Sequence, residues 1–335
     1  MSEKLSMAYA AANIFPLKFF LHHELIRKMN EERKVQPVHL QINPTNLCNF
    51  NCSFCSCSKR DKKLSLSIGR LQDLIEESAD LGCQAATITG GGEPLLYEDH
   101  DRMLQLLADN NIKTGIVTNG AYIDRPKSWE HVTWSRISAS DNLPVQLKKI
   151  KSCVGLWFSK INETVKNNGS VDWAFSYVLG ESPNNKLIEQ IVNFANVHSF
   201  THVRIVSDIF LGEKLGSQML NVQSYLKGKG IDCSRVIFQY RGFFSHGMNP
   251  CYISLLKPVI GADGGIYPCC GTQYALANPT RDYEKAMKMG EIEDFQSLYE
   301  EQKFFDGSIC VKCFYENYNL VSKVMLEGIA HKEFL

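Results

Sequence analysis

The cysteines are the residues of this chain best suited to chemistry, and most of them gather in two groups. The chain has 335 residues and 12 cysteines. The first group is the run CNFNCSFC, which holds Cys48, Cys52 and Cys55 and is followed by Cys57. Three thiolates on one loop can hold three irons of a cubic cluster and leave the fourth iron open. Tetrahedral zinc needs a fourth ligand, which Cys57 could supply.

The second group lies in the last quarter of the chain. Its members are Cys251, Cys269, Cys270, Cys310 and Cys313. Without Cys270 they form the pattern C-x17-C-x40-C-x2-C. Four such thiolates can close a structural zinc site or a fully ligated cubic cluster, and their spacing does not distinguish the two. Cys270 is adjacent to Cys269 and could replace it as a ligand.

A glycine-rich turn that ends in a carboxylate follows a short β-branched run. The segment AATIT continues into GGGEP, residues 90–94. Glycine lets a backbone approach a ligand closely, and a glutamate can receive an ammonium group. Gly91, Gly92 and Glu93 are therefore candidates for contact with a ligand.

The elements that must position these groups follow the pattern of a parallel α/β fold. Strands are predicted at VHLQINP, AATIT, KTGIVT, WSRISA, WAFSYVL and HVRIV, with RVIFQ as a further candidate. Helical spacing predicts helices at 67–82, 97–111, 185–199 and 219–229. These units fit a partial (β/α)6 TIM-like barrel. In parallel β-α folds ligands bind at the carboxyl ends of the strands, where CNFNCSFC and GGGEP both lie.

The composition divides the chain into three parts. We expect a helical lead-in over residues 1–36, the barrel over 37–240, and a small appendage rich in Cys, Gly and aromatic residues over 241–335, with a C-terminal helix. The apolar N-terminal stretch is interrupted by Pro16 and Lys18 and is too short for a membrane span, so we interpret it as an amphipathic helix that packs on the barrel.

The charge and the expected compartment narrow the possible partners. Lys plus Arg and Asp plus Glu number 36 each, which gives no reason to expect nucleic acid or an acidic membrane surface as a partner. We expect a cytoplasmic protein with no membrane partner. Clustered cysteines in a reducing cytosol are expected to be metal ligands or catalytic groups rather than disulfides.

The first cysteine group and the glycine-rich turn together resemble a known family. CNFNCSFC resembles the CxxxCxxC signature of the radical S-adenosylmethionine (SAM) superfamily, including an aromatic residue before the last cysteine, and GGGEP resembles its GGE or GEP motif on the next unit. The resemblance covers residues 37 to about 215. It implies a four-iron four-sulfur cluster on Cys48, Cys52 and Cys55, with SAM on the open iron. It also implies that Phe54 lies near the adenine of SAM and that Gly91, Gly92 and Glu93 contact its amino group.

Three further positions resemble the SAM-contacting positions of this family. Thr118 and Asn119 end the third predicted strand, and Ser138 lies in the fourth. Many relatives carry SxD on the fourth strand, whereas Ser140 stands here at the place of the aspartate and Asp141 follows it. The ribose contacts are therefore expected to differ in detail.

The second cysteine group lies in a segment that resembles an auxiliary-cluster domain. GADGGIYPCC resembles the GxxYPC hairpin of the domains called SPASM and twitch, and the shorter cysteine set resembles the twitch form with one cluster. The resemblance implies a second four-iron cluster on Cys251, Cys269, Cys310 and Cys313. Such a cluster could accept an electron from an oxidised substrate, or it could only staple a small appendage.

The reaction itself is left with three alternatives. The first is hydrogen abstraction from a small polar metabolite, such as an aminosugar, aminocyclitol or nucleoside, in a dehydrogenation or epimerisation. The second is maturation of a ribosomally made peptide, and the third is a non-catalytic iron–sulfur or zinc protein. The resemblance also implies an external one-electron reductant such as flavodoxin or ferredoxin. The candidate substrate residues are Tyr177, Arg204, Asp208, Arg241 and His246.

Overall fold

Parallel strands in chain order form most of the sheet in the computed structural model of the protein. The structure describes residues 16–242, 244–272, 274–277 and 283–329. The strands are β1 (His39–Ile42), β2 (Ala85–Ile88), β3 (Lys113–Thr118), β4 (Val132–Ser140), β5 (Asp172–Leu179), β6 (His202–Ser207), β7 (Val236–Gln239), β8 (Val259–Ile260), β9 (Gly265–Tyr267) and β10 (Gly290–Glu291). Their order in the single sheet is β10-β9-β8-β1-β2-β3-β4-β5-β6-β7.

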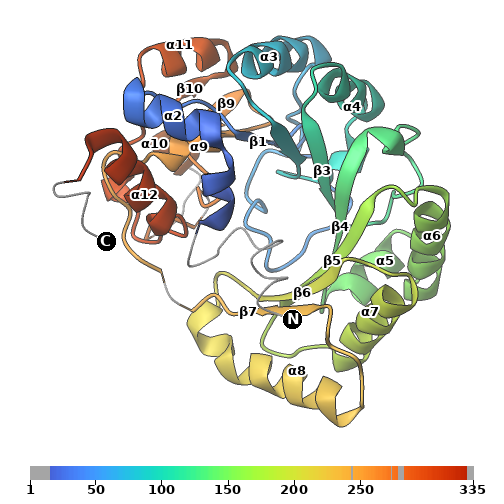
Figure 1. The fold of residues 1–335 in the computed structure, drawn as a ribbon. Coiled ribbons are helices and arrows are strands. Elements are labelled where there is room, and N and C mark those ends of the chain that lie inside the picture. The colour runs from blue at the N-terminus through green and yellow to red at the C-terminus, as the bar shows by residue number, and fades with distance from the viewer. Residues whose placement is uncertain (1–15, 243, 273, 278–282, 330–335) are drawn as a thin grey trace.

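The helices follow the strands and lie outside the sheet, which curves into an unclosed ring (Figure 1). The α-helices are α2 (His23–Glu31), α3 (Ile68–Asp80), α4 (His100–Asp109), α5 (Leu143–Lys149), α6 (Val154–Asn167), α7 (Asn185–Val197), α8 (Gly216–Gly228), α9 (Ile253–Leu256), α10 (Tyr283–Met287), α11 (Phe295–Glu300) and α12 (Glu316–Glu327). Short 3-10 helices are η1 (Leu17–Leu21), η2 (Pro94–Leu96), η3 (Trp129–His131), η4 (Gly212–Leu215), η5 (Ile292–Asp294) and η6 (Gly307–Ile309).

The partial barrel expected from the sequence is confirmed. Strands β1 to β6 and helices α3, α4, α7 and α8 lie where the patterns predict them, and RVIFQ contains β7. Helices α5 and α6, between β4 and β5, were not predicted. The helix α6 buries Trp157, Ile161 and Thr164 at helical spacing, so its sequence carried a usable signal.

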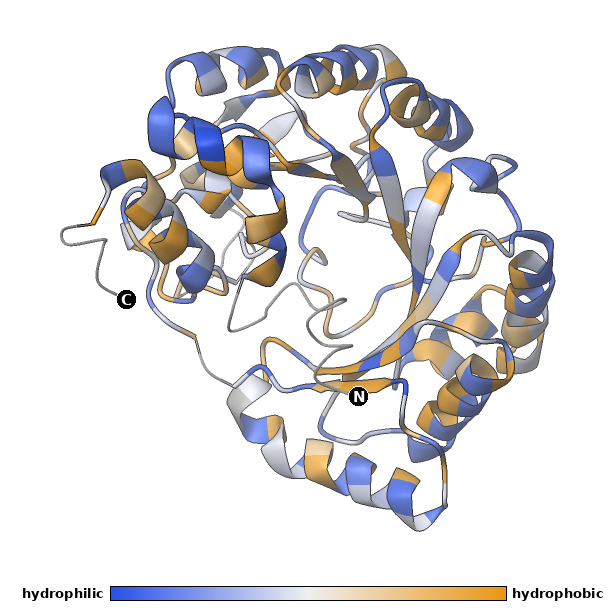
Figure 2. Ribbon diagram, in the orientation of Figure 1, coloured by the Kyte–Doolittle hydropathy of each residue, from blue (hydrophilic) through white to orange (hydrophobic). Residues whose placement is uncertain are grey.

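The core lies between the outer face of the sheet and the helices. Helix α3 illustrates the cause, because it buries Leu71, Leu74 and Ile75 at helical spacing and begins at Ser67, whose hydroxyl accepts a hydrogen bond from the Arg70 N–H. Figure 2 shows that α3, α4 and α7 each carry both hydrophilic and hydrophobic residues. The described residues contain no helix long and apolar enough to cross a membrane.

The C-terminal segment joins the barrel sheet instead of standing apart from it. Strand β8 pairs in parallel with β1, with Gln41 opposite Val259, and β9 and β10 extend the sheet in antiparallel pairs. Of the N-terminal lead-in, residues 1–15 lie outside the described part. In the described part of the lead-in, the Arg33 side chain donates a hydrogen bond to the carbonyl of Met325 in α12.

Candidate functional site

The loop of the first cysteine group and the GGGEP turn form one unit at the carboxyl ends of β1 and β2. The N–H of Gly92 donates to the Thr45 carbonyl at 2.9 Å, and the N–H of Glu93 donates to the Leu47 carbonyl at 2.8 Å. A Cβ on Gly92 would lie 2.1 Å from the Leu47 carbonyl oxygen. Only glycine therefore allows the turn to approach the loop this closely.

The ends of later strands hold the same loop from its other side. The side-chain amide of Asn119, after β3, donates to the Asn49 side chain at 3.0 Å. After β4, Gln146 both accepts from the Asn51 N–H and donates to the Asn51 carbonyl, at 3.3 Å in each case. The cysteine loop is thus fixed by contacts with three neighbouring units of the barrel.

Glu93 faces into the protein and links two strand ends. Its side chain is buried, with one carboxylate oxygen accepting from the Thr118 hydroxyl at 2.6 Å and from the Leu95 N–H at 3.1 Å. The other oxygen accepts from the Asn119 N–H at 2.7 Å. Burial raises the pKa of Glu93 to about 7. The carboxylate therefore holds the turn against β3, a role that the sequence analysis did not anticipate.

Three thiols of the first group, those of Cys48, Cys52 and Cys55, are candidate cluster ligands. The fourth, Cys57, makes a different contact. Cys48 and Cys52 are half-buried against the core, and the Cys48 sulfur accepts a hydrogen bond from the Phe50 N–H at 3.4 Å. Cys55 is also half-buried. The Cys57 thiol donates to the Gly90 carbonyl at 3.3 Å. The structure thus ties Cys57 to the glycine-rich turn.

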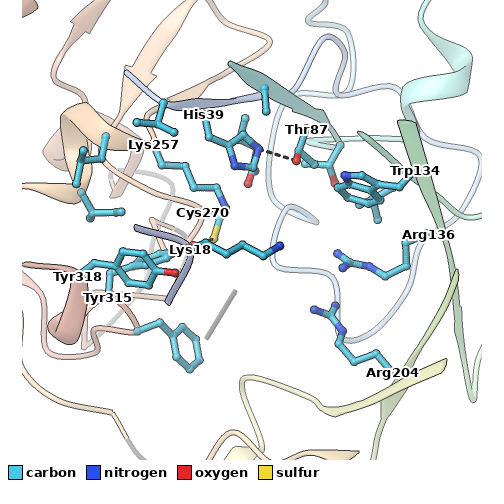
Figure 3. Close-up of a pocket in the computed structure, with 18 of the residues that line it drawn as sticks. Lys18, His39, Thr87, Trp134, Arg136, Arg204, Lys257, Cys270, Tyr315 and Tyr318 are labelled. Atoms are coloured by element: carbon cyan, nitrogen blue, oxygen red, sulfur yellow. Dashed lines mark hydrogen bonds between the residues drawn. The ribbon is translucent and has the colours of Figure 1, made fainter. Parts of the chain in front are cut away.

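A large cavity of about 1160 Å³ occupies the interior of the partial barrel (Figure 3). Near the first cysteine group it is lined by Phe54, Cys57 and Gly90, and on the C-terminal side by Cys270 and Tyr315. The volume exceeds that of a typical pocket for one small ligand, so SAM and a substrate could occupy it together. One space therefore connects the cofactor loop with the C-terminal segment.

The expected substrate residues divide between this cavity and other places. Arg204, Asp208 and Arg241 line the cavity. Tyr177 does not, because it lies on the opposite face of β5, where its hydroxyl donates to the Asp141 carboxylate. His246 is exposed and does not line this cavity. The residues Lys18, Trp134, Arg136 and Lys257 also line the large cavity and were not anticipated.

The remaining expected SAM contacts, Thr118, Asn119 and Ser138, differ in the hydrogen bonds that they form. Thr118 and Asn119 hold the Glu93 carboxylate, as described above, and the Asn119 side chain also accepts from the Ala121 N–H at 2.9 Å. Ser138 lies in β4, two residues beyond Arg136 and on the same side of the strand. Asp141 accepts hydrogen bonds from the Asn184 N–H and the Gly180 N–H, which explains its place after the strand.

The second cysteine group surrounds a small cavity of its own, about 20 Å³ in volume. Its lining includes Cys251, Cys269, Cys310 and Cys313, together with Gly247, Gly271 and Gly307. A Cβ on Gly247 would lie 2.1 Å from the Gly307 carbonyl oxygen, and one on Gly307 would lie 3.1 Å from the Cβ of Cys251. The glycines thus let the backbone enclose the four thiols.

The donors around these sulfurs fit a metal cluster. The Gly271 N–H donates to the Cys269 sulfur at 3.2 Å, and the Tyr315 N–H donates to the Cys313 sulfur at 3.3 Å. Burial raises the pKa of Cys251 to about 12 and that of Cys310 to about 11, so only a bound cationic group could keep both as thiolates. In the described part of the chain, no three Cys, His, Asp or Glu side chains converge closely enough for a single metal ion.

The adjacent cysteines of the hairpin point to different cavities. Cys269 lines the small cavity with the other three thiols, whereas Cys270 lines the large one. The Cys270 sulfur lies 3.2 Å from the Tyr315 hydroxyl. The geometry therefore favours Cys269 over Cys270 as the fourth ligand of a second cluster.

Comparison with known proteins supports the family resemblance of the first cysteine loop and the glycine-rich turn. The family model described as the radical SAM superfamily matches residues 42–133. A GTP 3',8-cyclase from Actinobacillus pleuropneumoniae is 32% identical over 96 residues, which is 27% of this chain and 28% of that protein. The S-adenosylmethionine-dependent nucleotide dehydratase of Selenomonas ruminantium is 31% identical over 90 residues, 27% of this chain and 32% of that protein. The chain thus spans about a third or less of the length of these relatives.

Solved structures extend the likeness of the fold to most of the chain. Streptococcus suis SuiB bound to its precursor peptide SuiA matches 89% of this chain and 77% of its own, with a TM-score of 0.59 and 16% identity. The structure of anSMEcpe with bound AdoMet and a peptide matches 89% and 85%, with a TM-score of 0.55 and 15% identity. At such identities the likeness concerns the fold. Residues 42–133 therefore form a radical SAM domain, and this family implies a four-iron four-sulfur cluster and S-adenosylmethionine as cofactors.

Proposed function

We propose that this enzyme abstracts hydrogen from a small substrate in the large cavity and oxidises it with the help of a second cluster. The main support for the proposal is that the cavity extends from the first cysteine group to the second. Its lining includes Phe54 and Gly90 beside the first cysteine group, and Cys270 and Tyr315 beside the second. A substrate between these two sides could meet the cofactor at one end and an electron acceptor at the other.

Cys48, Cys52 and Cys55 would hold the first cluster, and the turn around Gly91 would contact SAM. When bound, these cofactors supply a carbon radical that takes a hydrogen atom from the substrate. The contribution of the chain is to position one substrate hydrogen and to exclude water. Buried Glu93 serves this purpose, because its hydrogen bonds fix the glycine-rich turn against the end of β3.

The proposed oxidation balances as a two-electron step. One electron and one proton would leave the substrate as a hydrogen atom. Bound SAM, together with one electron from a reductant such as flavodoxin or ferredoxin, would accept that hydrogen atom and yield 5′-deoxyadenosine and methionine. Cys251, Cys269, Cys310 and Cys313 would hold a second cluster, which would supply an acceptor for the second electron, and a proton would leave to solvent. The product has lost two electrons and two protons.

The class of substrate is proposed to be a small polar metabolite of nucleoside-like kind. Two relatives that align with about a quarter of the chain are named for nucleotide chemistry, as a GTP cyclase and as a nucleotide dehydratase. The structures of SuiB and anSMEcpe contain peptides, but at 16% and 15% identity they support only the shared fold. No observation in the described residues favours a peptide over a small molecule.

The test separates the electron relay from a structural staple. We expect a folded variant with Cys310→Ser and Cys313→Ser to form 5′-deoxyadenosine from SAM and dithionite, but to lose the oxidised product in an anaerobic assay with candidate nucleosides and nucleotides. Cys233→Ser, which changes a half-buried cysteine of neither group, is the control. Circular dichroism checks that the barrel survives. An unchanged ratio of product to 5′-deoxyadenosine in the double variant would refute the relay.

A further inference from the structure

Besides the exposed Lys113, five cationic side chains line the large cavity, and they come from separate parts of the chain. This cation group consists of Lys18, Arg136, Arg204, Arg241 and Lys257. Figure 3 shows Arg136 of β4 and Arg204 of β6 side by side, with Lys18 and Lys257 reaching toward the same space from the other side. Positive charge is thus concentrated on opposite walls of one interior space.

The cation group outnumbers the carboxylates in the described lining of the cavity. None of its members forms an ion pair there, and the Nε atoms of Arg136 and Arg241 have no hydrogen-bond partner. Two acids line the same cavity. Asp208 accepts from the Phe210 N–H at 2.9 Å, and Asp172 is exposed at the start of β5.

Mutual repulsion adds to the cost of burying these groups. Burial, and then the nearby Arg241, lower the pKa of Arg136 to about 10. Burial, then Arg136 and Arg241, lower the pKa of Arg204 as well. Like charges held together in an interior destabilise the folded protein unless a ligand brings the opposite charge. The arrangement therefore costs stability in the absence of a ligand.

Contacts with neutral groups hold the cationic side chains ready for a ligand. The Arg136 guanidinium lies 5.6 Å from the ring centre of Trp134, and that of Arg241 lies 5.3 Å from the ring centre of Phe314. Arg204 donates to the Ser176 hydroxyl at 3.2 and 3.4 Å. Such contacts fix the direction of a guanidinium without neutralising its charge.

We propose that the substrate carries one or more phosphate groups, which the cation group binds through Arg136, Arg204 and Arg241. This inference rests on the proposed function and narrows it, because a cationic aminosugar or aminocyclitol would be repelled. Guanidinium groups match phosphate oxygens with paired hydrogen bonds. A phosphate ester carries close to two negative charges, whereas SAM brings a single carboxylate together with its own cationic groups. The carboxylate of SAM therefore cannot balance the cation group.

Binding of inorganic pyrophosphate to the reconstituted holoenzyme with SAM tests the proposal. The variants are Arg204→Met and Arg136→Met, and the matched control is Arg102→Met, which removes the same charge from the exposed side of α4. Calorimetry should show that each cavity variant binds pyrophosphate about 10- to 100-fold more weakly, whereas Arg102→Met binds it as the natural protein does. Without ligand, Arg204→Met should unfold at the same temperature as the natural protein or a higher one, because a buried repulsion is removed.

Three other results of the binding measurements overturn the inference. Equal pyrophosphate binding by all the proteins, or none by the natural one, excludes a phosphate site in the cavity. Citrate binding in place of pyrophosphate would assign a carboxylate ligand. If Arg204→Met weakened the binding of SAM but not of pyrophosphate, the cation group would belong to the cofactor. If Arg204→Met did not fold, Arg241→Met would provide the same comparison.

The same samples keep the two proposals apart. 5′-Deoxyadenosine formed from SAM and dithionite reports on the first cluster and does not require the substrate. If the natural protein forms 5′-deoxyadenosine but does not bind pyrophosphate, only the phosphate inference is refuted. A protein that reconstitutes yet never cleaves SAM refutes the proposed function.

Discussion

Replacement of Gly92 by alanine should separate the cysteine loop from the glycine-rich turn. The new Cβ would lie 2.1 Å from the Leu47 carbonyl oxygen and 2.5 Å from the carbonyl carbon of Asn46, both of them backbone atoms. Because no side chain can rotate away, the turn or the loop must shift. Such a shift strains the bonds from Gly92 N–H to Thr45 and from Glu93 N–H to Leu47, which join the two segments.

The magnitude follows from these contacts. Forcing an atom into a packed site costs about 1–3 kcal/mol, and each lost backbone hydrogen bond adds about 1 kcal/mol. We therefore expect Gly92→Ala to lower the free energy of unfolding by about 3–5 kcal/mol in urea titrations. A displacement of about 1 Å between the cysteine loop and the turn should also slow formation of 5′-deoxyadenosine about 100-fold.

Gly69→Ala is the matched control, because nothing lies within 4 Å of the Cβ it would add to helix α3. Alanine in a helix interior is favoured over glycine by about 0.5–1 kcal/mol, so this variant should be slightly more stable and fully active. If Gly92→Ala matched Gly69→Ala in stability and in SAM cleavage, the close approach of turn and loop would have no role in the site.

Three further predictions concern single side chains. Cys48→Ala should abolish 5′-deoxyadenosine formation. The natural protein should bind about eight irons after reconstitution, and this variant should bind about four fewer. Cys269→Ala should likewise lose about four irons, whereas Cys270→Ala should keep them all. Equal losses of iron in the two variants would reject Cys269 as the fourth ligand of the second cluster. Burial raises the pKa of Glu93 from 4.5 to about 7, so the unfolded chain releases its proton first. The free energy of unfolding should therefore fall as the pH rises from 4.5 to 7, by an amount on the order of 3 kcal/mol that Glu93→Gln removes in urea titrations at the two pH values.

The sequence predicted the features that depend on local patterns. The run CNFNCSFC and the turn GGGEP each lie within one β-α connection, so their spacing alone brings the relevant groups together. The periodicity of buried residues likewise predicted helices such as α3 and α7, because each buries one continuous face. The position of the C-terminal segment depends instead on the pairing of β8 with β1, which no local pattern reveals.

The alternation of large and small residues along β5 predicts the direction of the Tyr177 side chain. Strand β5 reads DWAFSYVL, in which Trp173, Phe175 and Tyr177 alternate with Ala174 and Ser176. The large residues share one face, on which Phe175 packs against Trp157 of α6 and Phe194 of α7, whereas Ala174 on the other face lines the cavity. Alternation along the strand therefore indicates that Tyr177 belongs to the core, despite its polar hydroxyl.

The cation group shows why the substrate site is harder to predict than the cofactor site. Arg136, Arg204 and Lys257 are distant in sequence and line one cavity only because β4, β6 and the segment before β8 belong to the same ring. Each alone is consistent with an ion pair that closes the sheet, and only the structure shows that none of them forms an ion pair with a described carboxylate. A partner for these charges therefore has to come from outside the folded chain, and SAM brings too little negative charge to serve as that partner. The distribution of charge in the cavity thus constrains the substrate more strongly than the cysteine motifs, which specify only the chemistry.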